Sequence, residues 1–102
     1  MENIYAYINS HYMDPDISLK QISSEVYVSY NYLCKFFKEQ TGMLFLDYLH
    51  TMRIDKSKEL LKNTNKAIND IAQSVGYLSS ISYIRKSKQL TGMTPGEYRK
   101  TV

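Results

Sequence analysis

Hydrophobic residues recur along most of the chain at intervals of three or four, which is the spacing of residues on one face of an α-helix. The first such stretch spans about residues 2–12, with Ile4, Ile8 and Tyr12 on one face. The segment 14–16, Asp-Pro-Asp, ends it. No stretch alternates apolar and polar residues in the way that a half-buried strand does. The pattern therefore predicts an all-α fold.

Two short helices are expected next, separated by a turn of about three residues. Ser18 and Ser29 each stand just before one of them, where a hydroxyl can accept a hydrogen bond from an unpaired backbone N–H. Gly42 is expected to end the second helix, because glycine readily adopts the left-handed conformation that closes many helices. The residues expected to face the core are Leu19, Ile22 and Val26 in the first helix and Tyr32, Leu33, Phe36 and Phe37 in the second.

A longer helix is predicted over residues 44–62, and the segment 63–65, Asn-Thr-Asn, ends it. The pattern then starts again, because residues 68–75 repeat the spacing of residues 19–26 at a shift of 49. After one inserted residue the shift becomes 50. The matched positions are Ser29 with Ser79, Lys38 with Lys88, Thr41-Gly42-Met43 with Thr91-Gly92-Met93, and Tyr48 with Tyr98. The chain is therefore an internal duplication.

The duplication divides a single domain of residues 1–102 into two units and a connection. The first unit is expected over residues 1–43, the linking helix over 44–62 and the second unit over 63–102. Each unit has a short helix, a tight turn and a second helix that begins after a serine, which is the outline of a helix-turn-helix. Two matched units in one chain make this interpretation much stronger than one would.

In a helix-turn-helix, the second helix enters the major groove of DNA and its side chains meet the base edges. Asparagine can pair with adenine, lysine or arginine with guanine, and isoleucine can contact a thymine methyl group. The exposed positions of the two predicted recognition helices carry these residue types. They are Tyr30, Asn31, Cys34, Lys35 and Lys38 in the first unit, and Ser80, Ile81, Ile84, Arg85 and Lys88 in the second.

The distribution of charge is compatible with an anionic partner. Residues 1–28 hold one lysine and four acids, whereas residues 29–102 hold twelve lysines or arginines and six acids. On charge alone, an ordinary solvated surface explains this asymmetry equally well.

The length of the linking helix is also compatible with DNA. A linking helix of about 19 residues spans ~28 Å at 1.5 Å per residue, close to the ~34 Å of one turn of B-DNA. Two recognition helices at this spacing can enter successive major grooves on one face, with bent DNA or imperfect docking making up the difference.

The residues also carry a family resemblance. The segment 18–61, from SLKQISSEVY to DKSKELL, resembles the first half of the DNA-binding domain of AraC/XylS-type transcriptional regulators, and the segments AINDIAQSVGY (67–77) and KQLTGMTPGEYRK (88–100) resemble its second half. The resemblance implies seven helices, the last beginning near Pro95. It implies that the base-facing residues are Asn31, Cys34 and Lys35 in the first unit and Ser80, Ile81, Ile84 and Arg85 in the second.

The same resemblance implies partners for the domain. Such domains are usually the C-terminal part of a longer regulator, and the leading helix is similar to the stretch that follows a phosphoacceptor receiver domain in some response regulators. Other members carry a ligand-binding domain there. We therefore expect double-stranded DNA, RNA polymerase and an N-terminal receiver or ligand-binding domain absent from this sequence as partners.

The second unit departs from the first at two core positions. Ser82 and Ser87 stand where the duplication places Tyr32 and Phe37. Losing a core phenylalanine costs roughly 3–5 kcal/mol when nothing refills the space. The second recognition helix is therefore expected to pack less completely than the first, unless neighbouring residues fill the space. The candidates for that repacking are Tyr83, Ile84 and Leu90.

Other chemistry finds little support. Cys34 is the single cysteine and has no His-Asp partner set nearby in sequence, and His11 and His50 lie on different predicted helices without further ligands at metal spacing. No acid pair or phosphate-binding loop is present, so we expect neither an enzyme nor a cofactor or metal site. The absence of an apolar run of ~20 residues and of a signal peptide fits a cytoplasmic protein without membrane contact.

Three further expectations concern single residues and the rival function. Tyr5 and Tyr30 are expected to be free of the core, and Arg53 is expected either to brace the two units or to contact phosphate. The rival function is a protein-interaction module that contacts polymerase or a receiver domain. A salt titration separates the two, because DNA binding weakens steeply with salt and a mostly apolar protein contact does not.

Overall fold

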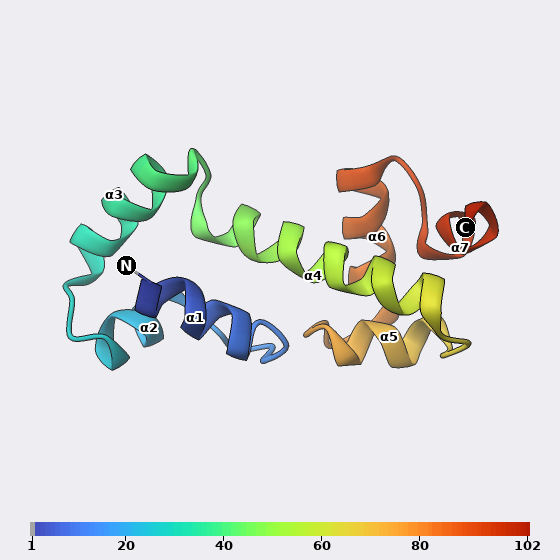
Figure 1. The fold of residues 1–102 in the computed structure, drawn as a ribbon, viewed down its shortest axis with the longest axis horizontal. Coiled ribbons are helices and arrows are strands. Elements are labelled where there is room, and N and C mark those ends of the chain that lie inside the picture. Colours follow the sequence, from blue (N-terminus) through green and yellow to red (C-terminus); the bar gives the residue numbers. More distant parts are fainter. Residues whose placement is uncertain (1) are drawn as a thin grey trace.

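The computed structural model describes residues 2–102, with side chains from Ile4 onward. Within these residues there is no strand, and the chain forms seven helices, as predicted (Figure 1). They are α1 (Glu2–His11), α2 (Leu19–Glu25), α3 (Tyr30–Thr41), α4 (Phe45–Asn63), α5 (Ile68–Ser74), α6 (Ser80–Thr91) and α7 (Pro95–Thr101). The molecule is elongated, with extents of 43 × 22 × 22 Å.

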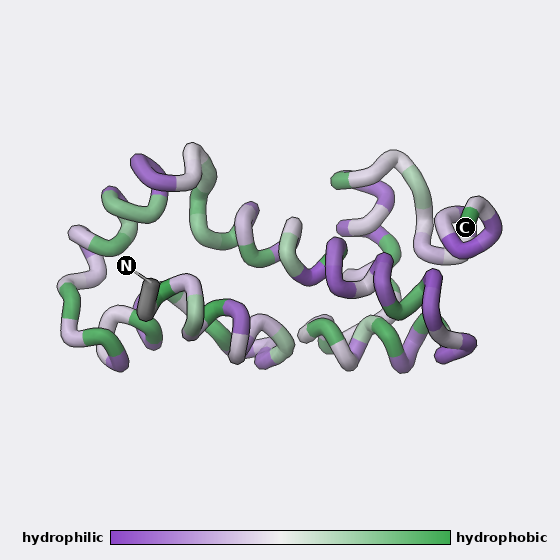
Figure 2. The backbone as a smooth tube through the Cα atoms, viewed as in Figure 1, coloured by the Kyte–Doolittle hydropathy of each residue, from purple (hydrophilic) through white to green (hydrophobic). Residues whose placement is uncertain are grey.

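The long helix α4 lies along the molecule and connects two groups of helices, α1–α3 at one end and α5–α7 at the other (Figure 1). The buried residues form two hydrophobic clusters, one at each end. Helix α4 contributes Phe45 and Leu49 to the first cluster and Ile54 and Leu61 to the second. We call α1–α3 with the start of α4 the first subdomain, and α5–α7 with the end of α4 the second. Figure 2 shows that hydrophilic residues are concentrated in the second half of α4 and in α7.

Equivalent residues begin and end α3 and α6, whereas α2 begins after a capping serine and α5 after Ala67, which has no side-chain cap. The hydroxyls of Ser18, Ser29 and Ser79 each accept a hydrogen bond from the backbone N–H three residues later, at 3.1–3.2 Å. The helices α3 and α6 both end at a glycine in the left-handed conformation, Gly42 with φ +73° and Gly92 with φ +80°. The caps predicted for Ser18, Ser29 and Gly42 are thus confirmed.

The repeated Thr-Gly-Met triplet has the same structural role in both subdomains. Thr41 and Thr91 each donate from Oγ1 to the carbonyl four residues earlier, at 2.8 and 2.7 Å. Each also accepts from the N–H of the methionine two residues later, at 3.1 Å. The threonine therefore satisfies backbone groups on both sides of the glycine, which fixes the turn out of each second helix.

Three predictions about aromatic side chains in the first subdomain are wrong. Phe36, expected to face the core, is half-buried and lies outside the hydrophobic cluster. Leu33 and Phe37 are fully buried, as expected, but Tyr32 is 55% exposed. Because Leu33 and Phe37 lie one turn apart and define the buried face, Tyr32 is carried to the flank of the helix. Tyr5 was expected to be free, yet its ring packs between those of Phe37 and Tyr48, with centroids 6.3 and 6.2 Å away.

The space expected beside Ser87 in the second subdomain is occupied. Tyr83, at the position equivalent to Leu33, is completely buried, and Ser87 is buried and donates to the Met93 carbonyl at 2.9 Å. The aromatic ring is thus supplied from one turn earlier in α6 than in α3. The expectation of incomplete packing is therefore wrong. Of the three residues considered for repacking, only Tyr83 is buried; Ile84 and Leu90 are 36% and 44% exposed.

Arg53 of α4 joins the two subdomains. Its side chain is 5% exposed and donates from Nε to the Tyr12 carbonyl (2.8 Å) and from Nη2 to the Asp14 carbonyl (2.9 Å). The guanidinium also lies over the Tyr77 ring, 5.3 Å from its centroid. Since Tyr12 and Asp14 follow α1 and Tyr77 precedes α6, the arginine ties the turns of both subdomains to α4. Of the two roles considered for Arg53, the structure shows the brace.

Candidate nucleic-acid interface

Both subdomains build a helix, a tight turn and a second helix, α2–α3 in the first and α5–α6 in the second. The turns contain a left-handed residue at equivalent places, Tyr27 with φ +57° and Gly76 with φ +108°. The second turn is one residue longer and contains Leu78, which is 80% exposed. The backbone of the helix-turn-helix motif is therefore made twice, with one insertion.

The second helix of each motif presents a side chain of the same kind directly away from the core. Lys35 stands two residues from both Leu33 and Phe37, so it lies about 200° around α3 from each of these buried side chains. Arg85 has the same relation to Tyr83 and Ser87 in α6. Both Lys35 and Arg85 are exposed. A long cationic side chain thus projects from the middle of each recognition helix.

The other predicted residues of α3 surround Lys35 unevenly. Asn31 and Lys38 are exposed beside it, and Tyr30 is 49% exposed at the start of the helix. Cys34 is half-buried and is a free thiol. Tyr30 and Cys34 line an apolar hollow of about 460 Å³ together with Leu44 and other residues of α2 and α4. The α3 face therefore combines an exposed polar stripe with a partly buried flank.

The predicted residues of α6 form a more apolar stripe around Arg85. Ile81 is 67% exposed and Ile84 is 36% exposed, while Ser80 is half-buried at the helix start. The exposed isoleucine side chains are not stabilised by burial in the free protein, and their methyl groups are available to an apolar partner such as the thymine methyl.

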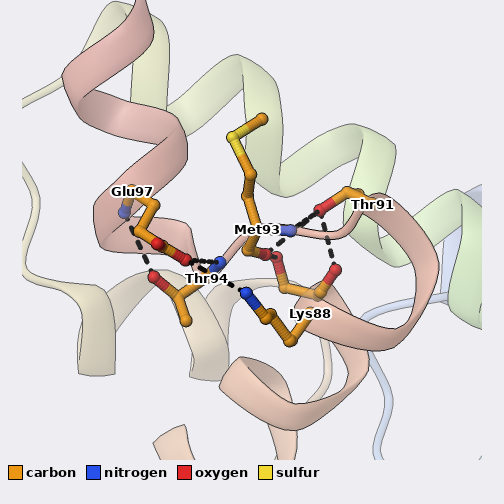
Figure 3. A network of polar contacts seen from close by, with 6 residues as sticks. Lys88, Thr91, Met93, Thr94 and Glu97 are labelled. Atoms are coloured by element: carbon orange, nitrogen blue, oxygen red, sulfur yellow. Dashed lines mark hydrogen bonds and ion pairs between the residues drawn. The ribbon is translucent and has the colours of Figure 1, made fainter.

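Lys88 is exposed but already has a partner. Its ammonium lies 3.7 Å from the Glu97 carboxylate of α7 (Figure 3). The same carboxylate accepts from the Thr94 N–H at 2.9 Å, while the Thr94 hydroxyl accepts from the Glu97 N–H, which completes a capping box. These backbone hydrogen bonds, with Lys88 adding to them, lower the pKa of Glu97. Lys38, the equivalent of Lys88, has no ion pair within the described part of the chain.

Tyr32 is a surface residue that the sequence pattern did not place at this interface. Its ring stacks on Phe36 with centroids 6.1 Å apart, and the two line a small hollow with Lys35 and Glu39. The position lies next to Lys35 on the side opposite Asn31. The pairing of Leu33 with Phe37 at a four-residue interval was the available signal, because it leaves positions 32 and 36 on the flank.

Positive charge dominates both recognition helices. Helix α6 carries Arg85, Lys86 and Lys88 without an acid, and α3 carries Lys35 and Lys38 against Glu39. Such a surface attracts the phosphate backbone of nucleic acid. Among the residues that the structure describes, no group of three or more His, Cys, Asp or Glu side chains is placed to hold a metal ion. None of the described helices is long and apolar enough to cross a membrane.

Two helix-turn-helix units on one connecting helix, each with an outward-facing cation, define a DNA-binding domain of the double helix-turn-helix class. The helix-turn-helix domain family matches residues 22–101 of the chain. The chain belongs to this family, in its AraC type, which confirms the resemblance seen in the sequence. The domain therefore serves sequence-specific DNA binding in the regulation of transcription, and its family is one of regulators rather than enzymes.

Similar proteins share both the sequence and the fold. An uncharacterized HTH-type transcriptional regulator of Bacillus subtilis, YtdP, is 34% identical over 94 residues, which are 92% of this chain and 12% of that protein. The chain thus spans only a small part of this relative. The C-terminal domain of AraT, a response regulator from Geobacillus stearothermophilus, is 31% identical with a TM-score of 0.96, over 99% of this chain and 84% of that one.

A third similar structure contains DNA. The DNA-binding domain of the global transcriptional factor AdpA, solved in complex with a target DNA, has a TM-score of 0.89 over 96% of this chain and 87% of that one. At 20% identity this likeness shows the shared fold.

Proposed function

We propose that this domain binds duplex DNA as a single chain, with α3 and α6 in two successive major-groove segments on one face of the duplex. The observation that carries the proposal is the equivalence of Lys35 and Arg85 on two helices held by one straight connector, α4. The 19 residues of α4 span about 28 Å, somewhat less than one turn of B-DNA. The DNA is therefore bent toward the protein, at a cost that extra contacts offset. The AdpA domain, which has the same fold, was solved with a target DNA.

The two recognition helices have different chemistry for base edges. In α3, Lys35 reads guanine and Asn31 reads adenine, with Cys34 beside them. In α6, Arg85 reads guanine, and the methyl groups of Ile81 and Ile84 contact thymine. The remaining contacts position the helices on the phosphate backbone and come from Tyr30, Lys38, Ser80 and Lys88.

We further propose that the domain works inside a longer cytoplasmic regulator. The support is that its relative YtdP is about eight times as long as the matched segment, and that the similar AraT domain is the C-terminal part of a response regulator. The rest of the protein then supplies a receiver or ligand-binding domain, and RNA polymerase is the partner on the promoter.

Alanine variants of the two outward cations test the base contacts. Lys35→Ala and Arg85→Ala should each raise the Kd of a selected duplex by roughly 5- to 150-fold, from ~1–3 kcal/mol, and should each relax base preference in a different half-site. Lys38→Ala and Lys88→Ala are the controls, and they should weaken all duplexes alike and flatten the salt dependence. Identical behaviour of all four variants would contradict the division into base and phosphate contacts. Affinity that does not fall with salt would favour a protein-interaction role instead.

A further inference from the structure

A hollow of about 400 Å³ lies at the junction of the two subdomains. Its walls come from four places: Pro15 in the loop after α1, His50 and Arg53 of α4, the turn that precedes α6, and one side of α6 with Arg85, Lys86 and Gln89. Because Arg85, the outward-facing cation of α6, lines it, the hollow borders the face of α6 that is proposed to contact DNA.

Positive charge surrounds this hollow. Among the described residues, no carboxylate lines it. The nearest acids that act on its basic groups are Asp47, which opposes the other charges at His50, and Asp14, which acts on Arg53. Arg53 is already engaged with two backbone carbonyls, whereas Lys86 has no ion pair within the described residues. The hollow therefore offers cations to an anion that the protein itself does not supply.

His50 lies at the edge of the hollow, where Tyr77 orients its ring. Its Nδ1 lies 2.8 Å from the Tyr77 hydroxyl, and the two rings stack with centroids 5.6 Å apart. Burial raises the pKa of Tyr77 to about 12, so the phenol keeps its proton. Its hydroxyl can therefore donate to Nδ1 of the neutral imidazole, which is one of the two tautomer arrangements that this contact admits. The neutral imidazole then carries its own proton on Nε2. This leaves an N–H donor on a half-buried ring next to Lys86.

We propose that this hollow receives one phosphate of the DNA backbone, with the Lys86 ammonium and the His50 Nε2–H as its two donors, where the duplex passes between α3 and α6. The inference rests on the proposed function, because it needs a duplex that spans both recognition helices. A phosphate held there fixes the register of both helices without reading sequence. A free phosphate ion has the same chemistry, and the test separates the two sources.

A proton linkage follows from this contact. In the free protein, burial and then the charges of Lys86 and Arg53 lower the pKa of His50, with Asp47 opposing them. A bound phosphate stabilises the imidazolium, so the pKa of His50 rises in the complex. DNA affinity therefore increases as the pH falls through the higher pKa of the complex, and it levels off below the pKa of the free protein. Each unit by which the pKa rises gives up to about tenfold in affinity.

The experiment measures the Kd of the 102-residue chain for one selected duplex against salt, at pH 5.5 and pH 8. Lys86→Gln should weaken binding to all duplexes alike and reduce the slope of log K against log salt by about one, and Lys86→Arg should restore it. His50→Gln should remove most of the pH dependence. The controls are Lys66→Gln, in the loop after α4, and His11→Gln, at the end of α1, which should change neither quantity because both side chains are exposed.

An NMR titration of the His50 ring in the unaltered protein gives a second readout that does not depend on any variant folding. The pKa of His50 should rise with duplex and stay unchanged with 20 mM inorganic phosphate alone. An equal rise with free phosphate would overturn the assignment to the DNA backbone. An unchanged pKa with bound duplex, together with a full salt slope for Lys86→Gln, would overturn the site while leaving the proposed function intact. Failure of the unaltered chain to bind any duplex would contradict the proposed function itself.

Discussion

The two recognition helices have the same length, the same capping residues and an outward-facing cation at the same position. Their larger and smaller buried side chains, however, stand in the opposite order along the helix. Helix α3 buries Leu33 and then Phe37, whereas α6 buries Tyr83 and then Ser87. Each pair supplies one aromatic ring and one smaller side chain, in opposite order along the helix. The comparison teaches that the buried aromatic ring can come from either of two positions one turn apart on the helix. The second pair is smaller in total, because serine is much smaller than leucine, and its serine hydroxyl donates to the Met93 carbonyl. The altered residues therefore leave the length and the caps of the second recognition helix the same as those of the first.

The turns of the two motifs differ in what surrounds them. Tyr27 has a side chain that is 94% exposed. At Gly76, by contrast, a Cβ atom would lie 2.7 Å from Arg53 Nε and 2.7 Å from the Tyr12 carbonyl. The left-handed residue is thus exposed to solvent in the turn of the first subdomain. In the second subdomain it packs against Arg53 and the Tyr12 carbonyl. Duplication preserved the backbone, and the contact between the subdomains then restricted one copy.

The largest expected effect comes from making the first core resemble the second at one position only. Phe37→Ser should lower the free energy of unfolding by about 3–5 kcal/mol, because Leu33 cannot fill the space that Tyr83 fills in α6. Adding Leu33→Tyr should recover part of this loss by supplying the ring from one turn earlier. Urea denaturation of the single and double variants measures both.

The matched control is Ser87→Phe in the second subdomain. Because Tyr83 already occupies that space, the larger side chain should destabilise by about 1–3 kcal/mol through overpacking. A stabilising Ser87→Phe, or a double variant no more stable than Phe37→Ser, would show that the Tyr83 ring does not take the place that the Phe37 ring has in the first subdomain.

A smaller effect is expected at the turns. Gly76→Ala should destabilise by about 3 kcal/mol, since it combines left-handed strain with two close contacts to groups that cannot move away. Tyr27→Gly should change stability by less than about 1 kcal/mol, because the relief of left-handed strain is offset by the flexibility of glycine. Thermal unfolding of both variants compares the two turns, and equal effects would contradict the role given to the brace.

The buried hydroxyl of Tyr83 gives a still smaller, opposite effect. It makes no hydrogen bond of good geometry among the described residues, although the Ser57 hydroxyl, which donates to the Ile54 carbonyl at 2.7 Å, is near enough to lower the pKa of Tyr83 against the larger effect of burial. Removing an unsatisfied buried hydroxyl relieves a desolvation cost, so Tyr83→Phe should stabilise the domain by about 1 kcal/mol. Chemical denaturation checks this, and a clear loss of stability would mean that the hydroxyl is satisfied.

The last and smallest effect compares, in acid, the first turns of α7 and α4, the helices that follow α6 and α3. The folded-state pKa of Glu97 lies below its ordinary value of 4.5, so its stabilising effect is complete above that pH and is lost as the pH falls through the lowered pKa. Glu97→Gln should therefore reduce the loss of melting temperature between pH 5 and pH 3. Asp47→Asn is the matched control, because Asp47 is equivalent to Glu97 but Leu44, the residue before α4, provides no side-chain cap. Equal responses of the two variants would show that the capping box does not contribute.

Periodicity was sufficient to predict the all-α fold, the caps at Ser18, Ser29 and Gly42 and the duplicated motif, since all of these depend on local spacing, whereas the number of seven helices came from the family resemblance. The packing of Tyr5 was not predictable in this way, because burial at the edge of a helix depends on which neighbouring element covers it, whereas the place of Tyr32 on the flank of α3 follows from the Leu33–Phe37 interval. The repacking by Tyr83 and the hollow between His50 and Lys86 depend on contacts between elements distant in sequence. The predicted base-contacting residues remain predictions, although the structure exposes most of them.

The central claim is that one chain carries two recognition helices, α3 and α6, which contact adjacent DNA segments with different side chains. Selection of bound sequences from a random duplex pool, followed by footprinting at increasing protein concentration, tests it most directly. We predict an asymmetric site of about two helical turns, with half-sites about ten base pairs apart, fully occupied by one chain. A symmetric palindrome that is protected only when two chains bind would contradict the claim.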